Sequence, residues 1–484
     1  MRRLNSVERA WHIVGKHGSA NAMRSFRISG PLTRGIAEKA FGGVLKIYPI
    51  LCCRIAADGK NFRFVKNESS PPKVIFRDQP FNLSEHHDLT ASLINAGIDP
   101  ENMPLLQFIV ATTDRADSAE HWIYLNFHHS ISDGMTKIAV MQCFLSLCDA
   151  VLESDSAFET VLTQLIGRGA DLSPSLTDSF MPRGIVSRTA ALLRFISRRA
   201  LRQTAYSDIY PSSATLAAEH TDLDAQQRAP KAPRCRIFEA TLPTSFAQQV
   251  LAVAKQNSLT LHELVTAALL KSIRTVLFFN DRRPGFSCIS FVNLRNRCSP
   301  PISVQAVGCY VSAAFSFHHV AATTDLIGLA KDISAQIKYA IDSEVVEQAT
   351  YASWMAKTLL AVGKKNIATL SISNIGLVSK ALAAKNYTVH EVHVHSALSG
   401  VGSAVSVGLT STNECLAFDF TFLEDIAAQA DIENIFLLTK EILDSLIAAN
   451  PQSPRTPEPP IIQVAPREVV PKEFVPRGFT EQHV

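Results

Sequence analysis

This sequence of 484 residues lacks several features that would assign it to a simple class. It has no run of 18 apolar residues, and its N-terminus lacks the short apolar core of a secretory signal. We therefore expect a cytoplasmic protein without a transmembrane segment. A net charge of only +3 gives no reason to expect nucleic acid as a partner. The absence of a Gly-x-Ser-x-Gly elbow and of a phosphate-binding loop argues against a serine hydrolase or a nucleotide enzyme.

The cysteines give no sign of a disulfide framework or a zinc site. They are odd in number and lack Cys-x-x-Cys spacing, at positions 52, 53, 143, 148, 235, 288, 298, 309 and 415. We expect reduced, mostly buried thiols. His393 and His395 share one face of a predicted strand, but no third ligand is recognisable near them in the sequence. An exposed strand face is therefore expected there, and no metal site.

Length and composition favour two domains of about 200 residues each. The hydrophobic content of 46% and charged content of 19% are those of a globular protein. We expect the following division: an N-terminal subdomain at 1–152, a connector at 153–234, a C-terminal subdomain at 235–450 and a proline-rich, disordered tail at 451–484.

The connector is predicted to contain a basic helix at 183–202, which has six arginines and no acidic residue. One interpretation is a crossover helix with a solvated arginine face. The other is a surface for the phosphates of coenzyme A, an acidic carrier protein or an anionic lipid.

Local patterns predict several elements. Asn5 and Glu8 have the spacing of a capping box, as have Thr260 and Glu263, and each pair precedes a helical pattern. Residues 105–112 and 121–129 are expected to pair as a hairpin. Further strands are expected at about 50–57, 62–66, 286–292, 307–317, 368–373, 388–396, 402–411 and 414–422, and further helices at about 32–48, 323–343 and 430–448.

The most informative segment is Asn126 to Gly134, because it places two histidines between a strand and a helix. Apolar and polar residues alternate before His128, and apolar residues recur at three- and four-residue steps after Gly134. A neutral imidazole held there can accept a proton from a hydroxyl or amine that attacks a carbonyl. Alternatively, the histidines merely end the strand and Asp133 caps the helix. The pairs at 86–87 and 318–319 lack the Asp-Gly, and we interpret them as surface or strand-end residues.

The pattern His-His-x-x-x-Asp-Gly, from His128 to Gly134, resembles the active-site motif of the thioester-dependent acyltransferase superfamily. That superfamily includes peptide condensation domains, alcohol acetyltransferases and polyketide-associated acyltransferases. Further segments resemble it in the same order, at 5–11, 48–55, 291–295, 307–312 and 373–376. The resemblance covers about residues 1–448.

The resemblance implies an α/β (α+β) fold of two chloramphenicol-acetyltransferase-like subdomains, each a mixed sheet flanked by helices, with the active-site channel between them. It implies that His129 is the general base, supported by His128, Asp133 and Gly134. Asp133 would pair with Arg295, or with Arg297 as the competing assignment. Ser373 and Asn374 would lie near the reacting carbonyl, where one of them could donate to the oxyanion, although Asn374 could equally serve a turn.

By the same resemblance, the expected activity is acyl transfer from a CoA or carrier-protein thioester to an alcohol, by direct attack and without a bound cofactor. The donor thioester and the alcohol are then the partners of a monomer. Two alternatives are a free-standing condensation domain that forms an amide and a non-catalytic homologue that docks carrier proteins.

Overall fold

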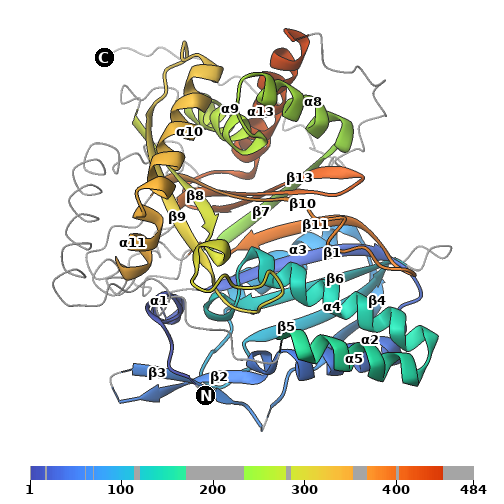
Figure 1. Ribbon diagram of the computed structural model, residues 1–484. Coiled ribbons are helices and arrows are strands. Elements are labelled where there is room, and N and C mark those ends of the chain that lie inside the picture. Colours follow the sequence, from blue (N-terminus) through green and yellow to red (C-terminus); the bar gives the residue numbers. More distant parts are fainter. Residues whose placement is uncertain are drawn as a thin grey trace, which may run out of the picture. The chain divides into compact units, whose positions relative to one another are not determined.

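The structure is a computed structural model in which residues 2–16, 19–59, 61–68, 70–113, 120–169, 234–278, 285–352, 368–398 and 403–450 are described. Within these ranges, two sheets lie one above the other, with helices on their outer sides (Figure 1). The predicted basic helix at 183–202 and the tail from 451 lie outside the described residues.

The first sheet has five strands in the order β11-β1-β6-β5-β4, with β6 in the centre. The predicted hairpin is confirmed, because β5 and β6 are antiparallel and Leu106 is paired with Phe127. The strands are β1 (Asn21–Ser29), β4 (Val74–Phe81), β5 (Leu106–Thr113), β6 (Glu120–His128) and β11 (Thr388–Ser396). A separate hairpin consists of β2 (Cys53–Asp58) and β3 (Asn61–Lys66), preceded by η1 (Pro49–Cys52).

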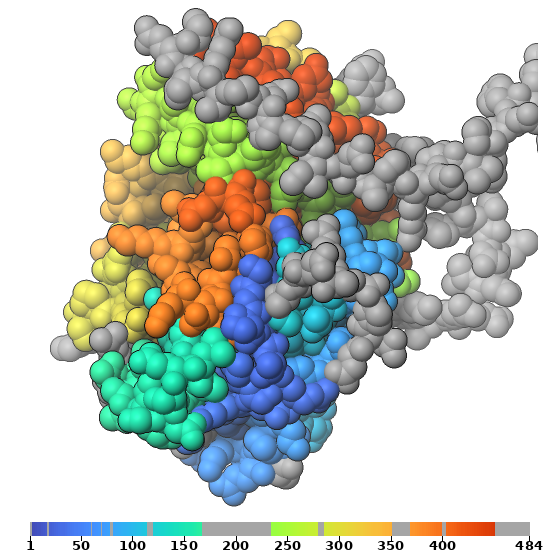
Figure 2. All heavy atoms as spheres, turned by 90° about the vertical axis from the view of Figure 1, so that its right-hand side faces the viewer, coloured from blue at the N-terminus to red at the C-terminus, as the bar shows by residue number. Residues whose placement is uncertain are grey.

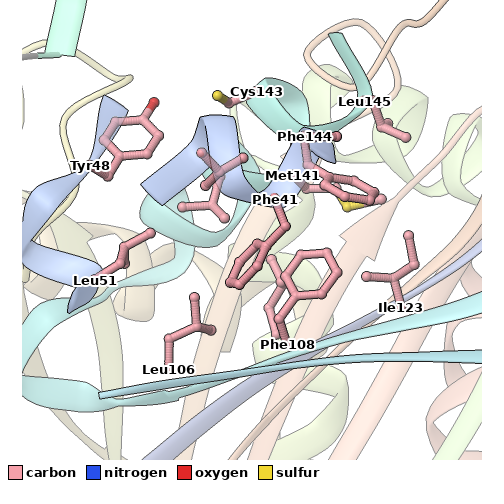
Figure 3. Packing of buried hydrophobic residues seen from close by; sticks show 14 of the residues in the cluster. Phe41, Tyr48, Leu51, Leu106, Phe108, Ile123, Met141, Cys143, Phe144 and Leu145 are labelled. Atoms are coloured by element: carbon pink, nitrogen blue, oxygen red, sulfur yellow. The ribbon is translucent and has the colours of Figure 1, made fainter. Parts of the chain in front are cut away.

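We call the first sheet and the helices of the N-terminal part of the chain the first lobe, and the second sheet with its helices the second lobe. The helices of the first lobe are α1 (Ser6–Gly15), α2 (Arg34–Ile47), α3 (Leu83–Ala96), α4 (Gly134–Glu153) and α5 (Asp155–Gly169), with a short turn, η2 (His129–Ile131), before α4. The apolar core between the sheet and α2, α4 and α5 includes Phe41, Phe108 and Phe144 (Figure 3). Along β6, alternate residues face opposite ways: Ile123 lies in this core and Tyr124 in a second one between the sheets. The strand is therefore buried on both faces, rather than half-buried as its pattern predicts.

Helix α4 is long and apolar enough to cross a bilayer by length and composition alone. Its apolar window is 67% buried, however, and it packs against α2 and α5. The same composition is typical of the core helix of a globular protein. Helix α5 occupies the start of the segment that we expected to be a connector, so the first lobe extends beyond residue 152.

The second sheet has six strands in the order β7-β13-β12-β10-β8-β9. Helices α8, α9, α10 and α13 cover its outer face (Figure 1). The strands are β7 (Cys235–Pro243), β8 (Gly285–Asn293), β9 (Val311–His319), β10 (Ala368–Leu377), β12 (Ser403–Ser411) and β13 (Cys415–Leu423). The helices are α8 (Thr244–Gln256), α9 (Leu261–Leu277), α10 (Leu326–Asp342), α11 (Val345–Ala352) and α13 (Gln429–Ala448), with a short turn, η4 (Arg295–Arg297).

Strand β11 departs from the expected division into subdomains. It comes from the C-terminal half of the chain, yet it pairs with β1 over Ala22–Ser29 and so belongs to the first sheet. Figure 2 shows the orange C-terminal segment directly beside the blue N-terminal segment on one face. Local sequence predicts the strand but not its neighbour, because pairing is a property of the topology.

Other local predictions are confirmed. The capping boxes at Asn5–Glu8 and Thr260–Glu263 are both formed. All nine cysteines are free, and all except the half-buried Cys52 are buried.

Candidate active site

The end of the central strand β6 holds the two histidines of the HHxxxDG turn, the name used here for residues 128–134. The backbone N–H of His128 donates to the carbonyl of Leu105 (2.9 Å), and that of His129 donates to the carbonyl of Ala20 (2.8 Å). Both neighbours are part of the first lobe, so the turn begins from a fixed backbone. The position of the two imidazoles is therefore set by the sheet itself.

His128 occupies a supporting place. Its side chain is buried, with 1% exposure, and Nδ1 lies 2.8 Å from Oγ of Ser130 and accepts from the backbone N–H of Ser130. Burial lowers the pKa of His128 to about 3, so the imidazole is neutral near pH 7. These contacts hold the turn and leave His128 out of reach of a substrate.

His129 is partly exposed and its ring is held flat against the indole of Trp11, with centroids 4.0 Å apart and planes 3° from parallel. Nδ1 lies 3.9 Å from Sγ of Cys309. Burial, with the nearby charge of Lys137, lowers the pKa of His129 to about 4, and hydrogen bonding to the backbone of residues 129 and 132 offsets only part of this. The result is an oriented, neutral imidazole near pH 7, as a general base requires.

The carboxylate of Asp133 holds the backbone of the HHxxxDG turn and is not bonded to the imidazole of His129. Its Oδ1 accepts from the backbone N–H of Thr136 (2.8 Å), which caps α4, and its Oδ2 accepts from the N–H of Tyr310 (2.9 Å). Arg295 completes the set with two bonds to the carboxylate, Nη1–Oδ2 at 2.5 Å and Nη2–Oδ1 at 3.1 Å. Burial by itself would raise the pKa of Asp133, but Arg295 and these N–H donors hold it below its ordinary value.

Arg295 connects the two lobes. The side chains of Asp133 and Arg295 are 4% and 1% exposed, so the pair is shielded from solvent. Arg295 also donates to the hydroxyl of Thr136 (3.2 Å) and the carbonyl of Ala306 (3.1 Å). Arg297, the competing partner, points away and forms an ion pair with Glu347. The structure thus places Arg295, and not Arg297, against Asp133.

Gly134 begins α4 at a point of close approach. A Cβ built on it would lie 2.3 Å from Cδ1 of Ile375 at the end of β10. A side chain of the second lobe therefore fills the space beside this glycine.

Ser373 and Asn374 lie on the same end of β10 and are both half-buried. The side-chain Oδ1 of Asn374 accepts from the N–H of Gly376 (2.8 Å), whose φ of +77° suits glycine. Asn374 therefore serves the turn, the second of the two roles open to it. Ser373 lies two residues before Ile375, on the strand that reaches the HHxxxDG turn.

Two buried cations near the turn were not identified from the sequence. Lys137 is 2% exposed and donates to Oγ of Ser132 (3.2 Å) and the carbonyl of Asp133 (3.3 Å), and burial lowers its pKa to about 7. Arg24 on β1 is fully buried, and among the described residues no partner bonds its three guanidinium nitrogens. Nη2 of Arg24 lies 3.8 Å from the Cβ position of Gly134. Lys137 follows Asp133 by one helical turn, a spacing that could have identified it.

Comparisons with known proteins concern the fold and the sequence of the C-terminal part of the chain. Residues 230–421 match the sequence family described as the C-terminus of phthiocerol/phthiodiolone dimycocerosyl transferase. Among curated proteins, no sequence relative is found.

Solved structures with the same fold include the following three proteins. Polyketide synthase associated protein 5 from Mycobacterium tuberculosis is 15% identical, with 92% of this chain and 98% of that chain covered and a TM-score of 0.60. Trichothecene 15-O-acetyltransferase from Fusarium sporotrichioides is 12% identical, with 92% and 95% covered and a TM-score of 0.68. The condensation domain of the Monacolin K polyketide synthase MokA is 12% identical, with 92% and 97% covered and a TM-score of 0.63.

These likenesses confirm the predicted fold class, and they confirm the resemblance to the condensation-type and polyketide-associated acyltransferases. At such low identities the structural matches establish the fold, and the matched C-terminal half adds a family likeness in sequence.

Proposed function

We propose that this protein transfers an acyl group from a CoA or carrier-protein thioester to a hydroxyl group, with His129 as the general base. The observation that carries the proposal is the state of His129: a neutral ring, aligned by Trp11, on a turn that Asp133 and Arg295 lock in place. The family likeness of residues 230–421 and the shared fold support an acyltransferase of this general kind.

The proposed reaction proceeds in two steps. Nδ1 of His129 faces Cys309 and the local backbone, which leaves Nε2 for the acceptor. As the acceptor oxygen attacks the thioester carbonyl, its proton passes to Nε2 and a C–O bond forms. The tetrahedral oxyanion then collapses, the C–S bond breaks, and the thiolate takes the proton from the imidazolium. The products are an ester and a free thiol, and these steps need no bound cofactor.

Lys137 and Arg24 contribute through charge. Both are buried cations close to the HHxxxDG turn, where a positive potential favours the negative charge that develops on the carbonyl oxygen. The same charge of Lys137 helps to keep His129 unprotonated. Ser373 remains a candidate donor to the oxyanion.

The test uses the full chain with acyl-CoA or acyl-carrier thioesters and either alcohol or amine acceptors, with thiol release and product mass as readouts. Turnover with alcohols that falls about 10²- to 10⁴-fold in His129→Gln supports the proposal. His319→Gln, which changes an exposed histidine at the end of β9, is the matched control and should keep full activity.

Three results would contradict the proposal. A His129→Gln variant as active as the wild type would exclude His129 as the base. Amide products with amines, and no ester with alcohols, would favour the condensation alternative. Binding of carrier protein without turnover of any thioester would favour a docking homologue.

A further inference from the structure

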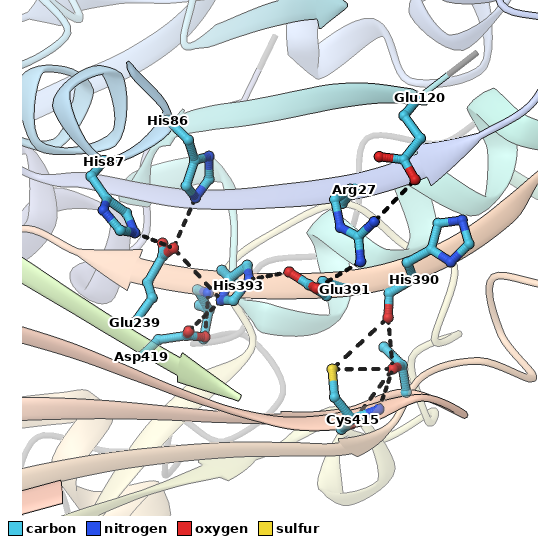
Figure 4. A network of polar contacts seen from close by, with 12 residues as sticks. Arg27, His86, His87, Glu120, Glu239, His390, Glu391, His393, Cys415 and Asp419 are labelled. Carbon is cyan, nitrogen blue, oxygen red and sulfur yellow. Dashed lines mark hydrogen bonds and ion pairs between the residues drawn. The ribbon is translucent and has the colours of Figure 1, made fainter. Parts of the chain in front are cut away.

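A second cluster of ionisable side chains lies between the two sheets, where the sequence predicted an exposed strand face. His393 and His395 on β11 are only 2% and 1% exposed. They face two carboxylates of the second sheet, Glu239 on β7 and Asp419 on β13, which are paired in that sheet. Figure 4 shows His393 beside both carboxylates. The prediction of an exposed strand face is therefore wrong. The side chains that face the two histidines come from residues remote in sequence, which is why the sequence did not reveal them.

The four side chains converge closely. Nε2 of His395 lies 2.7 Å from Oε1 of Glu239, and Nδ1 of His393 lies 2.6 Å from Oδ1 of Asp419. Nδ1 of His393 is also 4.0 Å from Oε2 of Glu239. One ligand atom from each of Glu239, His395 and Asp419 lies within 4.8 Å of the other two. Glu239, His395 and Asp419 thus bring three possible ligand atoms together, and His393 adds a fourth donor that contacts both carboxylates.

A second layer of hydrogen bonds orients both rings. The outer nitrogen of His395, Nδ1, lies 3.0 Å from Oγ1 of Thr421. The outer nitrogen of His393, Nε2, lies 3.3 Å from Oε2 of Glu391, which Arg27 holds in turn (Figure 4). An oxygen acceptor on the outer nitrogen can keep the N–H there when a metal displaces the proton that each inner nitrogen shares with a carboxylate. That is the usual arrangement of metal-ligating histidines.

The carboxylates are also fixed. Oδ2 of Asp419 accepts from the backbone N–H of Val394 (2.8 Å), so Oδ1 is left to face the histidines. Glu239 is approached on Oε2 by Nε2 of His86 (2.9 Å) and by Nε2 of His87 (3.4 Å). The side chain of His87 is 40% exposed, and it marks the solvent side of the cluster.

We propose that His393, His395, Glu239 and Asp419 bind a divalent transition metal, with zinc as the best fit. Zinc takes imidazole nitrogens and carboxylate oxygens at about 2.0–2.2 Å in a tetrahedral shell, so neighbouring ligand atoms lie roughly 3.3–3.5 Å apart. The imidazole–carboxylate separations of 2.6, 2.7 and 4.0 Å lie on both sides of that value. The two short ones would lengthen and the long one would shorten when the ion enters.

Four protein ligands form a closed shell, which is typical of a structural metal and not of a catalytic one. The ion would join β11 of the first sheet to β7 and β13 of the second. This role is independent of acyl transfer at His129, so the two proposals can fail separately.

The test uses tag-free, full-length protein that is stripped with a chelator and then dialysed against buffered zinc. We expect about one zinc per chain by mass spectrometry of the metal, and a melting temperature that rises with free zinc. Glu239→Gln and His395→Gln should each lose the bound zinc. The matched control is His390→Gln. His390 lies on the same strand, β11, but pairs with Glu414 (2.7 Å) outside the cluster, so this variant should keep the bound zinc.

X-ray absorption at the zinc edge of the wild type keeps the test decisive if a variant does not fold. A first shell of nitrogen and oxygen with imidazole scattering supports the site. A shell that contains sulfur would place the zinc on cysteines and overturn the proposal. So would less than one-tenth of a zinc per chain, or undiminished zinc in Glu239→Gln.

Discussion

Replacing Asp133 with asparagine would remove the charge that holds the HHxxxDG turn while keeping the size of the side chain. Asparagine caps helices about as well as aspartate, so the cap on Thr136 should survive. What is lost is the partner of Arg295, whose side chain is 1% exposed. Leaving one member of a buried ion pair uncompensated costs about 3–5 kcal/mol.

This free energy can be converted into a melting temperature. Residues Met1–Pro454 form one compact unit, and an unfolding entropy of about 2.1 cal/mol/K per residue gives roughly 0.95 kcal/mol/K for it. The expected decrease for Asp133→Asn is therefore about 3–5 °C in a calorimetric or fluorescence melt, together with reduced turnover.

The control is Arg297→Gln, two residues along the same short turn as Arg295. Its side chain is 33% exposed and pairs with Glu347, so we expect a change of about 1 °C or less. Combining Asp133→Asn with Arg295→Gln should cost less than the sum of the two single changes, because it removes both charges together. Equal melting temperatures for Asp133→Asn and the wild type would refute the idea that this pair locks the turn.

Four further predictions concern the same site. Because the pKa of His129 is lowered to about 4, kcat/KM should not decrease from pH 7 to about 5, where Lys137 also gains its charge, and should fall by half near pH 4; a loss of activity with a midpoint near 6.5 would contradict this. The folded state cannot accept the proton that His128 takes up near pH 6.5 when unfolded, so its contribution to stability should be fully present above that pH and decrease by about 1.4 kcal/mol per unit below it. Burial lowers the pKa of His12, His129 and His262 in the same way, so the urea midpoint should be lower at pH 5 than at pH 7; equal midpoints would contradict this. Gly134→Ala should lower both activity and melting temperature, and Ile375→Ala should restore part of each, since the added methyl would meet Ile375 at 2.3 Å; no restoration would exclude that clash as the cause. Trp11→Leu should lower kcat about 2- to 12-fold, the equivalent of an aromatic contact of about 0.5–1.5 kcal/mol; unchanged turnover would show that the stack does not align His129.

The sequence predicts elements well where one local rule decides them. The capping boxes, the hairpin of β5 and β6, and α4 all follow from spacing within a few residues. Strand β1 lacks a local pattern of this kind, because it contains Arg24 and Arg27. The side chain of Arg24 is completely buried. A charged residue in a buried strand conceals the apolar pattern on which prediction depends.

The same distinction holds for the site. The turn from His128 to Gly134 is a contiguous motif, so it could be identified and its partner Arg295 suggested by resemblance. The histidine cluster could not, because His393 and His395 meet Glu239 only through the pairing of distant strands. His86, predicted to be an ordinary surface or strand-end residue, is buried in a helix and bonds to the same glutamate.

Strand β11 has a consequence for any attempt to produce the halves of this protein separately. A fragment that stops before residue 235 would leave the outer hydrogen-bonding edge of β1 open over Ala22–Ser29, and open edges recruit other chains. Such a fragment should aggregate alone but stay in solution when the C-terminal fragment is co-expressed and supplies the absent strand. The two halves would then behave as a split protein whose reassembly can itself be measured.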